Sequence, residues 1–261
     1  MISMLDKIVA KTEERLIEAK SKKSLDQLKE EVLKLDISDE FPFKEALKDP
    51  EIAIIAEVKK ASPSKGLIAE DFDYIEIAKD YEQAGASAIS VLTEPYFFKG
   101  SNDYLKEIAE NVHIPILRKD FTLDEYMIYE AKSLGASAIL LIVSILDDVQ
   151  LKEYLGLAHE LGLSAIVETH DEDEIAAAID VGAEIIGVNN RNLADFTVDI
   201  NNSVNLRRLV SDDILFISES GIKTAEDVRR LKENNVDAVL IGELLMKSDD
   251  KKAIIAELKN G

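Results

Sequence analysis

The sequence has no cysteine, no tryptophan and only three histidines in 261 residues. The lack of cysteine excludes disulfides, thiolate nucleophiles and cysteine-ligated zinc or iron–sulfur centres. His159 and Glu160 begin like a zinc-protease helix, but the second histidine is missing, so we expect no metal site. The glycine-rich segments of nucleotide-binding proteins and the G-x-S-x-G turn of hydrolases are absent as well. We therefore expect no cofactor.

Positive charge is scarce, with 31 Lys and Arg against 52 Asp and Glu and a formal net charge of −21. This balance argues against binding to nucleic acid or to an anionic membrane. No apolar run approaches the roughly 20 residues that cross a bilayer, and the segment from Met1 to Lys22 lacks the apolar core of a signal peptide. We expect a cytoplasmic protein, a monomer or weak homodimer, whose partner is a small molecule.

Short apolar runs of strand length recur along the chain, each followed by a stretch of helical period. They start 20 to 36 residues apart, about the length of one strand and one crossover helix. They do not alternate polar with apolar residues, which is typical of parallel strands buried on both faces. Eight such units in about 250 residues predict an α/β protein, a single (β/α)8 TIM barrel. The predicted strands are Ile52–Ala56, Ala88–Leu92, Ile114–Leu117, Ala138–Val143, Ala165–Val167, Ile185–Val188, Ile214–Ile217 and Ala238–Ile241.

Glycines mark the ends of several predicted helices. Gly85, Gly135 and Gly162 begin similar lead-ins to a strand, and Gly182 begins a looser copy. Each is placed where a left-handed residue commonly closes a helix.

Residues 1–50 form a predicted N-terminal helical extension of this barrel. Leu5, Ile8 and Leu16 are among the apolar residues that suggest one amphipathic helix, and Ser24 and Gln27 have the form of a capping box that opens a second. Periodicity leaves open whether the extension covers the bottom, the rim or the mouth of the barrel. No linker-like segment follows it, so we treat residues 1–261 as a single domain.

Polar side chains follow the apolar runs at the carboxyl ends of the predicted strands, where barrels of this type carry their chemistry. Two lysines and several glutamates converging there predict an acid–base site. We expect burial to lower the pKa of the lysines and to raise that of the glutamates. The candidates are Glu57, Lys59, Lys119, Glu168, Asn189, Arg191 and Glu219.

The ends of the last two strands have a different composition. Ser220 and Gly221 follow the seventh strand, and Gly242 and Glu243 follow the eighth. Barrels of this kind hold a phosphate at these two strands with backbone N–H groups and a short extra helix. We therefore predict a phosphate site here.

The segment Ile54–Gly66, IIAEVKKASPSKG, resembles the first-strand signature of the indole-3-glycerol-phosphate synthase family. Further matches follow in the family's order over residues 50 to 250. They are Ser90–Glu94, Tyr96–Ser101, Ile116–Phe121, Val167–His170, Ile186–Leu193, Ser218–Ile222 and Ile241–Glu243.

The resemblance implies a carboxy-lyase of tryptophan biosynthesis that needs no cofactor. Its substrate, 1-(2-carboxyphenylamino)-1-deoxyribulose 5-phosphate, closes to indole-3-glycerol phosphate with loss of carbon dioxide and water. Lys119 resembles the family's general acid on the carbonyl and Glu168 the acid–base partner in dehydration. Lys59 would contact the carboxylate or share the acid role, with Glu57 and Glu219 orienting the lysines. How the two lysines divide the work stays open.

The resemblance also implies the residues that hold the substrate. Asn189 would bind a hydroxyl, Arg191 and Ser62 the carboxylate, and Phe98 the benzene ring. The phosphate would lie on the backbone of Gly221, Gly242 and Glu243, with Ser220 nearby. The alternatives are another phosphate-binding barrel, such as phosphoribosylanthranilate isomerase or the tryptophan synthase α-subunit, or a non-catalytic sugar-phosphate sensor. The other barrels do not explain Lys59 together with Lys119, and the intact set of acids and bases argues against a sensor.

Overall fold

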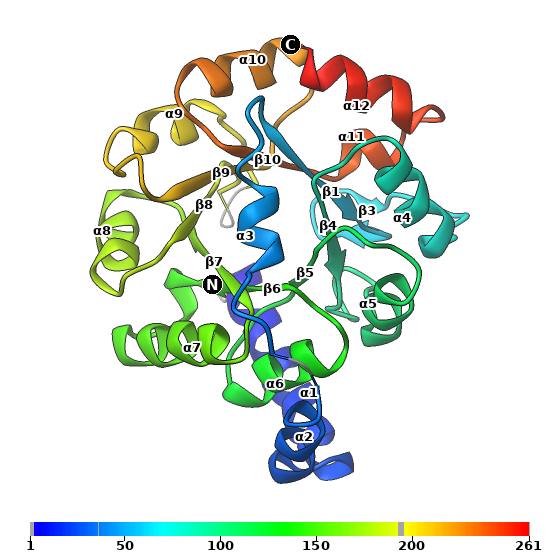
Figure 1. Cartoon of the computed structure of the whole chain (residues 1–261), viewed down its shortest axis with the longest axis vertical. Helices are drawn as coiled ribbons and strands as arrows, with labels where there is room; N and C mark the ends of the chain where they lie inside the picture. The colour runs from blue at the N-terminus through cyan, green and yellow to red at the C-terminus, as the bar shows by residue number, and fades with distance from the viewer. Residues whose placement is uncertain (1–2, 36, 193–195, 261) are drawn as a thin grey trace.

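Eight parallel strands pair side by side and close on themselves, so that the first strand pairs with both the second and the last. The computed structural model describes residues 3–35, 37–192 and 196–260. Figure 1 shows the resulting barrel with a ring of helices around it. The predicted (β/α)8 TIM barrel is thereby confirmed. The strands are β1 (Ala53–Val58), β4 (Ala88–Leu92), β5 (Ile116–Lys119), β6 (Ala138–Ile142), β7 (Ser164–Thr169), β8 (Ile185–Asn189), β9 (Leu215–Glu219) and β10 (Ala238–Ile241).

Several predicted strands end too early. The strands run on to Val58, Lys119, Thr169, Asn189 and Glu219, because the backbone continues to pair after the apolar run has ended. Five of the predicted site residues are therefore the last or next-to-last residues of barrel strands, where the sheet fixes their direction, namely Glu57, Lys119, Glu168, Asn189 and Glu219.

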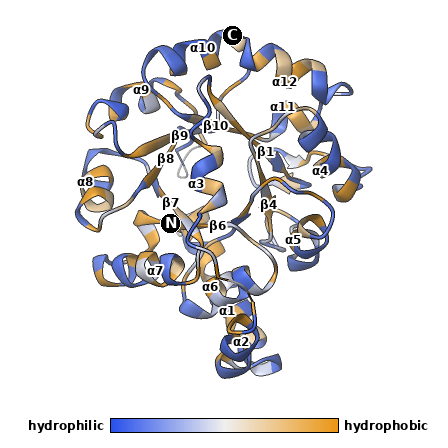
Figure 2. Ribbon diagram, viewed as in Figure 1, coloured by the Kyte–Doolittle hydropathy of each residue, from blue (hydrophilic) through white to orange (hydrophobic). Residues whose placement is uncertain are grey.

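The ring of helices covers the outer face of the strands, and Figure 2 shows apolar residues gathered on the strands with polar residues outside. Gly85, Gly135, Gly162 and Gly182 have φ between 68° and 89°, as predicted for left-handed residues. A short ribbon of β2 (Ala61–Ser62) and β3 (Gly66–Leu67) follows β1. The helices are α4 (Tyr74–Gln83), α5 (Asn102–Ala109), α6 (Glu125–Ser133), η1 (Val143–Ile145), α7 (Asp148–Glu160), α8 (Glu172–Asp180), α9 (Asn201–Arg207), α10 (Ala225–Glu233), α11 (Glu243–Met246) and α12 (Lys251–Lys259).

The N-terminal extension forms α1 (Met4–Lys22), α2 (Leu25–Val32) and α3 (Pro42–Ala46). Both α1 and α2 start with a capping box, and the one at Ser24 was predicted. In Figure 1, α3 crosses the near end of the barrel and α1 lies behind it. Phe43 of α3 packs against the residues that begin the strands, and α1 lines the cavity where they end. The extension thus covers both ends of the barrel.

Parts of the predictions lie outside the described residues. These are residues 1, 2 and 36 of the extension, residue 261, and Leu193 of the sixth-strand motif. Among the residues that the structure does describe, no helix is long and apolar enough to span a membrane.

Candidate active site

A cavity of about 650 Å³ lies at the carboxyl ends of the strands, and we call it the mouth cavity. All thirteen predicted site residues line it, although they lie on or after seven of the eight barrel strands. They are Glu57, Lys59, Ser62, Phe98, Lys119, Glu168, Asn189, Arg191, Glu219, Ser220, Gly221, Gly242 and Glu243. The structure therefore brings the whole set together, while their chemical roles stay predictions.

Lys119 occupies the centre of this site, at the end of β5. Its Nζ lies 2.9 Å from Oε2 of Glu168 on β7 and 2.5 Å from Oε2 of Glu219 on β9. Asn189 on β8, between these two strands, donates from Nδ2 to Oε1 of Glu168 at 3.3 Å. Both glutamates are almost fully buried, so one ammonium group bridges two carboxylates that water barely reaches.

The charges in this cluster move its pKa values in opposite directions. Burial raises the pKa of Glu219 to about 7, since Lys119 only partly offsets the burial and the charge of Glu168. Burial also acts on Glu168, but Lys119 and His170 outweigh it and hold the pKa of that carboxyl below its usual value. Of the two carboxyl groups, Glu219 therefore takes up a proton first as pH falls.

The expected lowering of the lysine pKa is wrong for Lys119, and the expected rise of the glutamate pKa is wrong for Glu168. Burial does lower the pKa of Lys119, but the charges of Glu168 and Glu219 outweigh burial and raise that pKa above its ordinary value. The expectation counted neighbouring cations and apolar walls, whereas the closest neighbours are carboxylates. Lys119 is thus a charged donor in the ligand-free site.

A second acid–base pair stands at the end of β1. Lys59 Nζ donates to Oε1 of Glu57, whose side chain is only 4% exposed. Gly242, which follows β10, lies directly against this pair, because a Cβ there would fall 2.4 Å from Glu57 Oε1 and 2.9 Å from Lys59 Nζ. Glycine at this position leaves the two side chains room to meet.

The predicted phosphate region lies where β9 and β10 end. Ser220 and Gly221 both have left-handed backbone, with φ of 68° and 89°. Such a conformation is strained for serine and occurs mainly at functional sites. Gly242 precedes the short helix α11, which the sequence analysis expected here.

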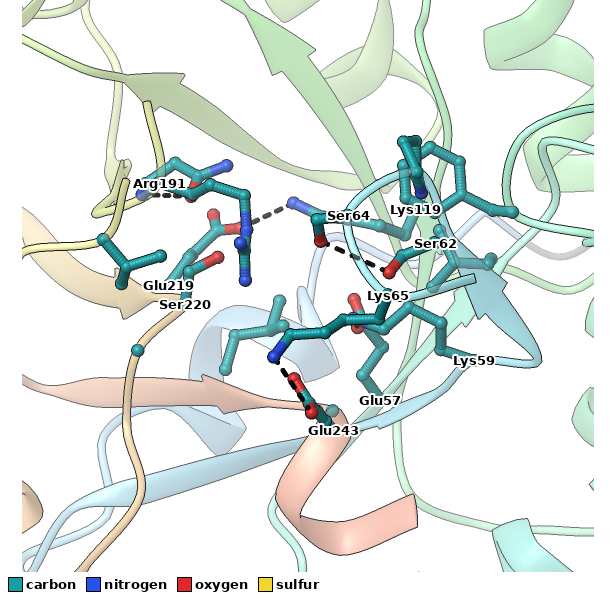
Figure 3. A pocket seen from close by; sticks show the side chains of 18 of the residues that line it. Glu57, Lys59, Ser62, Ser64, Lys65, Lys119, Arg191, Glu219, Ser220 and Glu243 are labelled. Atoms are coloured by element: carbon teal, nitrogen blue, oxygen red, sulfur yellow. Dashed lines mark hydrogen bonds and ion pairs between the residues drawn. The ribbon is translucent and has the colours of Figure 1, made fainter. Parts of the chain in front are cut away.

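Lys65 is a residue of this region that the sequence analysis did not use. It lies in the turn between β2 and β3, and its Nζ lies 3.5 Å from Oε1 of Glu243, as Figure 3 shows. Glu243 also accepts from Lys247 at 2.7 Å, so two lysines surround its carboxylate. No pattern around Lys65 marks it as functional, because only the fold places this turn beside β10.

Apolar side chains form another part of the wall of the mouth cavity. The rings of Phe98 and Phe121 lie 6.1 Å apart, and Leu5 and Ile8 of α1 also face the cavity. Beside this wall, the Ser62 and Ser64 hydroxyls are 3.5 Å apart. The cavity thus has one apolar wall and one lined by ionisable groups.

One ion pair fixes α1 over this wall. Arg15 donates to both carboxylate oxygens of Asp120, at 3.0 and 2.7 Å, and to the carbonyl of Thr93 at 3.3 Å. Asp120 is buried and also accepts from the Thr93 hydroxyl at 2.5 Å. The pair joins residues 105 positions apart, which is why the sequence analysis missed it.

Comparison with known proteins decides between the functions left open. The family model described as indole-3-glycerol phosphate synthase matches residues 5–258. The chain belongs to the indole-3-glycerol phosphate synthase family. The synthase of Ruminiclostridium cellulolyticum is 56% identical over 256 residues, and that of Leuconostoc mesenteroides is 55% identical over 258 residues, each alignment covering 98% of both chains. The predicted family, and with it the lyase activity in tryptophan biosynthesis, is confirmed.

Solved structures of distant sequence share the fold alone. The 3-hexulose-6-phosphate synthase from Salmonella typhimurium has a TM-score of 0.66 at 14% identity, covering 80% of this chain and 97% of its own. An N-acetylmannosamine-6-phosphate 2-epimerase from Clostridium perfringens has a TM-score of 0.61 at 17% identity, covering 77% and 89%. At such identity the likeness supports the barrel and says nothing of the reaction.

Proposed function

We propose that Lys119 is the general acid that closes the indole ring of 1-(2-carboxyphenylamino)-1-deoxyribulose 5-phosphate. The observation that carries this is the position of its Nζ, which is charged and held between Glu168 and Glu219 at the centre of the mouth cavity. A proton from Lys119 to the ketone oxygen makes that carbon electrophilic while the aromatic ring carbon attacks it.

The remaining steps use the carboxylates around the lysine. Loss of carbon dioxide restores the aromatic ring, after which the hydroxyl must leave as water. Glu168 has the position for this acid–base work, since it contacts Lys119 and Asn189 and is almost fully buried. Glu219 holds Lys119 in place, and Glu57 does the same for Lys59 across the cavity.

The two ends of the substrate are anionic, and the cavity offers a different environment for each. The phosphate lies on the backbone at Ser220, Gly221, Gly242 and Glu243, within reach of Lys65. The carboxylate lies near Arg191, whose planar fork can bind both oxygens, with Ser62 and Lys59 beside it. The benzene ring packs on Phe98, and the apolar wall from α1 supports it.

No step of this scheme needs a metal or cofactor. We also propose that the enzyme is cytoplasmic and works as a monomer or weak homodimer.

The test is turnover of this substrate by the purified protein, followed by indole fluorescence. We expect Lys119→Ala to fold and to lose roughly 10²- to 10⁴-fold in kcat, the usual contribution of a general acid. Near-normal turnover by the variant would remove Lys119 from the acid role. A wild-type protein that binds the substrate without releasing carbon dioxide would instead indicate a sensor.

A further inference from the structure

The reaction consumes one proton per turnover, which the site must obtain from water. The substrate enters with an ionised carboxylate, which leaves as neutral carbon dioxide, and its ketone oxygen leaves as water. One proton goes to the ketone oxygen and a second goes to the departing hydroxyl. One proton returns to the site when the newly closed five-membered ring loses a C–H proton. The difference is one proton, yet Glu168 and Glu219 are only 4% and 2% exposed. This reasoning rests on the proposed role of Glu168.

His170 lies on the side of Glu168 that faces away from Lys119. Its Nε2 is 3.5 Å from Oε1 of Glu168, while Lys119 binds the other oxygen, Oε2. The Nε2 atom is buried and has no hydrogen-bond partner among the residues that the structure describes. Hydrogen bonds in ligand-free active sites are often long and shorten when substrate binds. The imidazole thus has one nitrogen directed at the acid–base carboxylate.

The Nδ1 atom of His170 binds Glu174, so the proton that the ring can give to Glu168 is the one on Nε2. Oε2 of Glu174 on α8 accepts from the backbone N–H of His170 at 2.8 Å and lies 3.0 Å from Nδ1. A carboxylate only accepts, so Nδ1 carries a proton. An unprotonated Nε2 would direct its lone pair at the Glu168 carboxylate, and the two would repel each other. A protonated Nε2 directs an N–H group at that carboxylate and is attracted to it.

A second cavity connects this histidine with water. It has a volume of about 570 Å³, is lined by His170, Glu174, Asp171 and Asn202 among others, and we call it the side cavity. Asn189 and Arg191 line both cavities. The His170 and Glu174 side chains are 20% and 18% exposed, so they have more contact with solvent than Glu168 has.

We propose that His170 is a positioning residue that acts through Glu168, supplying it with a proton from the side cavity during each turnover. The Nε2–H bond breaks, its electron pair stays on nitrogen, and a new O–H bond forms at Oε1 of Glu168. The neutral ring keeps its Nδ1–H bond, hydrogen-bonded to Glu174, and its Nε2 takes a replacement proton from a water molecule that enters from the side cavity and leaves as hydroxide. Glu168 passes its proton to the departing hydroxyl, which leaves as water.

The charges around His170 favour its protonated form. Burial lowers its pKa, but the hydrogen bond to Glu174 and the charges of Glu168, Glu174 and Glu219 outweigh burial, so the pKa lies above its ordinary value. Asp171 and Arg191, which line the side cavity, add one charge of each sign. The ring therefore keeps its proton to higher pH than an ordinary imidazole does.

The test compares kcat and KM of the full chain for wild type, His170→Asn, His170→Ala and Glu168→Gln between pH 6 and 9. His113→Asn is the matched control, because His113 is 95% exposed and outside both cavities. We expect His170→Asn to lower kcat by roughly tenfold or more at low pH, where the wild-type ring is protonated, and by less as pH rises and the wild type loses that proton, with KM little changed. Added imidazole should restore part of the kcat of His170→Ala. Activity should fall at alkaline pH as the His170 ring loses its proton. Glu174→Gln leaves the ring in place but removes the carboxylate that stabilises its protonated form, so this fall should occur at lower pH.

Two results would overturn the inference. One is a kcat of His170→Asn equal to that of His113→Asn at every pH. The other is a loss that is independent of pH, comes with a higher KM and is not rescued by imidazole, which would indicate a structural role. If His170→Ala fails to fold, the pH profiles of His170→Asn and Glu174→Gln decide. A fully active Glu168→Gln would instead refute the proposed role of Glu168, whereas an inactive Glu168→Gln beside a normal His170→Asn would refute only the supply of protons.

Discussion

Lys119 and Glu219 are 100 residues apart in the chain and meet with 2.5 Å between Nζ and Oε2. Parallel strands β5 and β9 bring them to the same end of the barrel, where neither side chain has much contact with water. The contact keeps the lysine charged, and burial in turn raises the pKa of the glutamate to about 7. The ionisation of Glu219 therefore decides whether Lys119 is held for catalysis near neutral pH.

The pH dependence of kcat/KM follows from this pair. Below about pH 7 Glu219 takes up a proton and no longer binds Lys119 as a charged partner, so kcat/KM of the wild type should fall as pH decreases. Glu219→Gln should have lower activity throughout and should lose this acid limb. Glu45→Gln, a change of an exposed residue on α3, should keep the wild-type profile. An unchanged acid limb in Glu219→Gln would assign that titration to another group.

Gly242 gives a test of the second acid–base pair. A Cβ at this position would lie 2.4 Å from Glu57 Oε1, so Gly242→Ala should displace Glu57 and Lys59. We expect kcat/KM to fall by roughly tenfold or more, equivalent to about 1.4 kcal/mol, while the fold is retained. Gly156→Ala is the matched control, because nothing lies within 4 Å of its Cβ in helix α7. That control should keep full activity and gain up to about 1 kcal/mol of stability.

Arg15 gives a test of how α1 is held over the site. Arg15→Ala removes the two hydrogen bonds that Asp120 accepts from α1 but leaves Arg118 3.5 Å from its Oδ2, so it should cost about 2 kcal/mol in the free energy of unfolding. KM should rise as well, since Leu5 and Ile8 of the same helix line the mouth cavity. Urea unfolding and steady-state kinetics measure the two effects. Lys11→Ala removes an exposed pair of α1 and should leave both unchanged, and an equal loss there would contradict a specific role for Arg15.

The barrel and the residues that line its mouth cavity could be predicted from the sequence, because both depend on short-range sequence patterns. Apolar runs mark buried parallel strands, and polar residues at their ends mark the mouth, so Glu57, Lys119 and Glu168 were found without any contact being known. The ends of the strands were misplaced, since backbone pairing does not stop where hydrophobicity does.

The partners within the site could not be predicted, because they join distant parts of the chain. The pKa of Lys119 was expected in the wrong direction because the sequence does not show that Glu168 and Glu219 are its nearest neighbours. Arg15 with Asp120 and Lys65 with Glu243 were missed for the same reason. His170 was named in the family segment Val167–His170 and weighed as a metal ligand, but it was given no role, since the sequence does not show that its ring lies between two carboxylates.

Ser220 connects backbone strain with phosphate binding. Its φ of 68° is unfavourable for serine and natural for glycine, so Ser220→Gly should keep or raise stability, by up to about 1 kcal/mol. If the serine side chain helps to hold the phosphate, KM should nevertheless rise severalfold, and binding of inorganic phosphate should weaken in parallel. Asn235→Gly is the matched control, with φ of 59° outside both cavities, and should leave KM unchanged. An unchanged KM in both variants would mean that only the backbone at residue 220 holds the phosphate, because glycine preserves its direction while removing the hydroxyl.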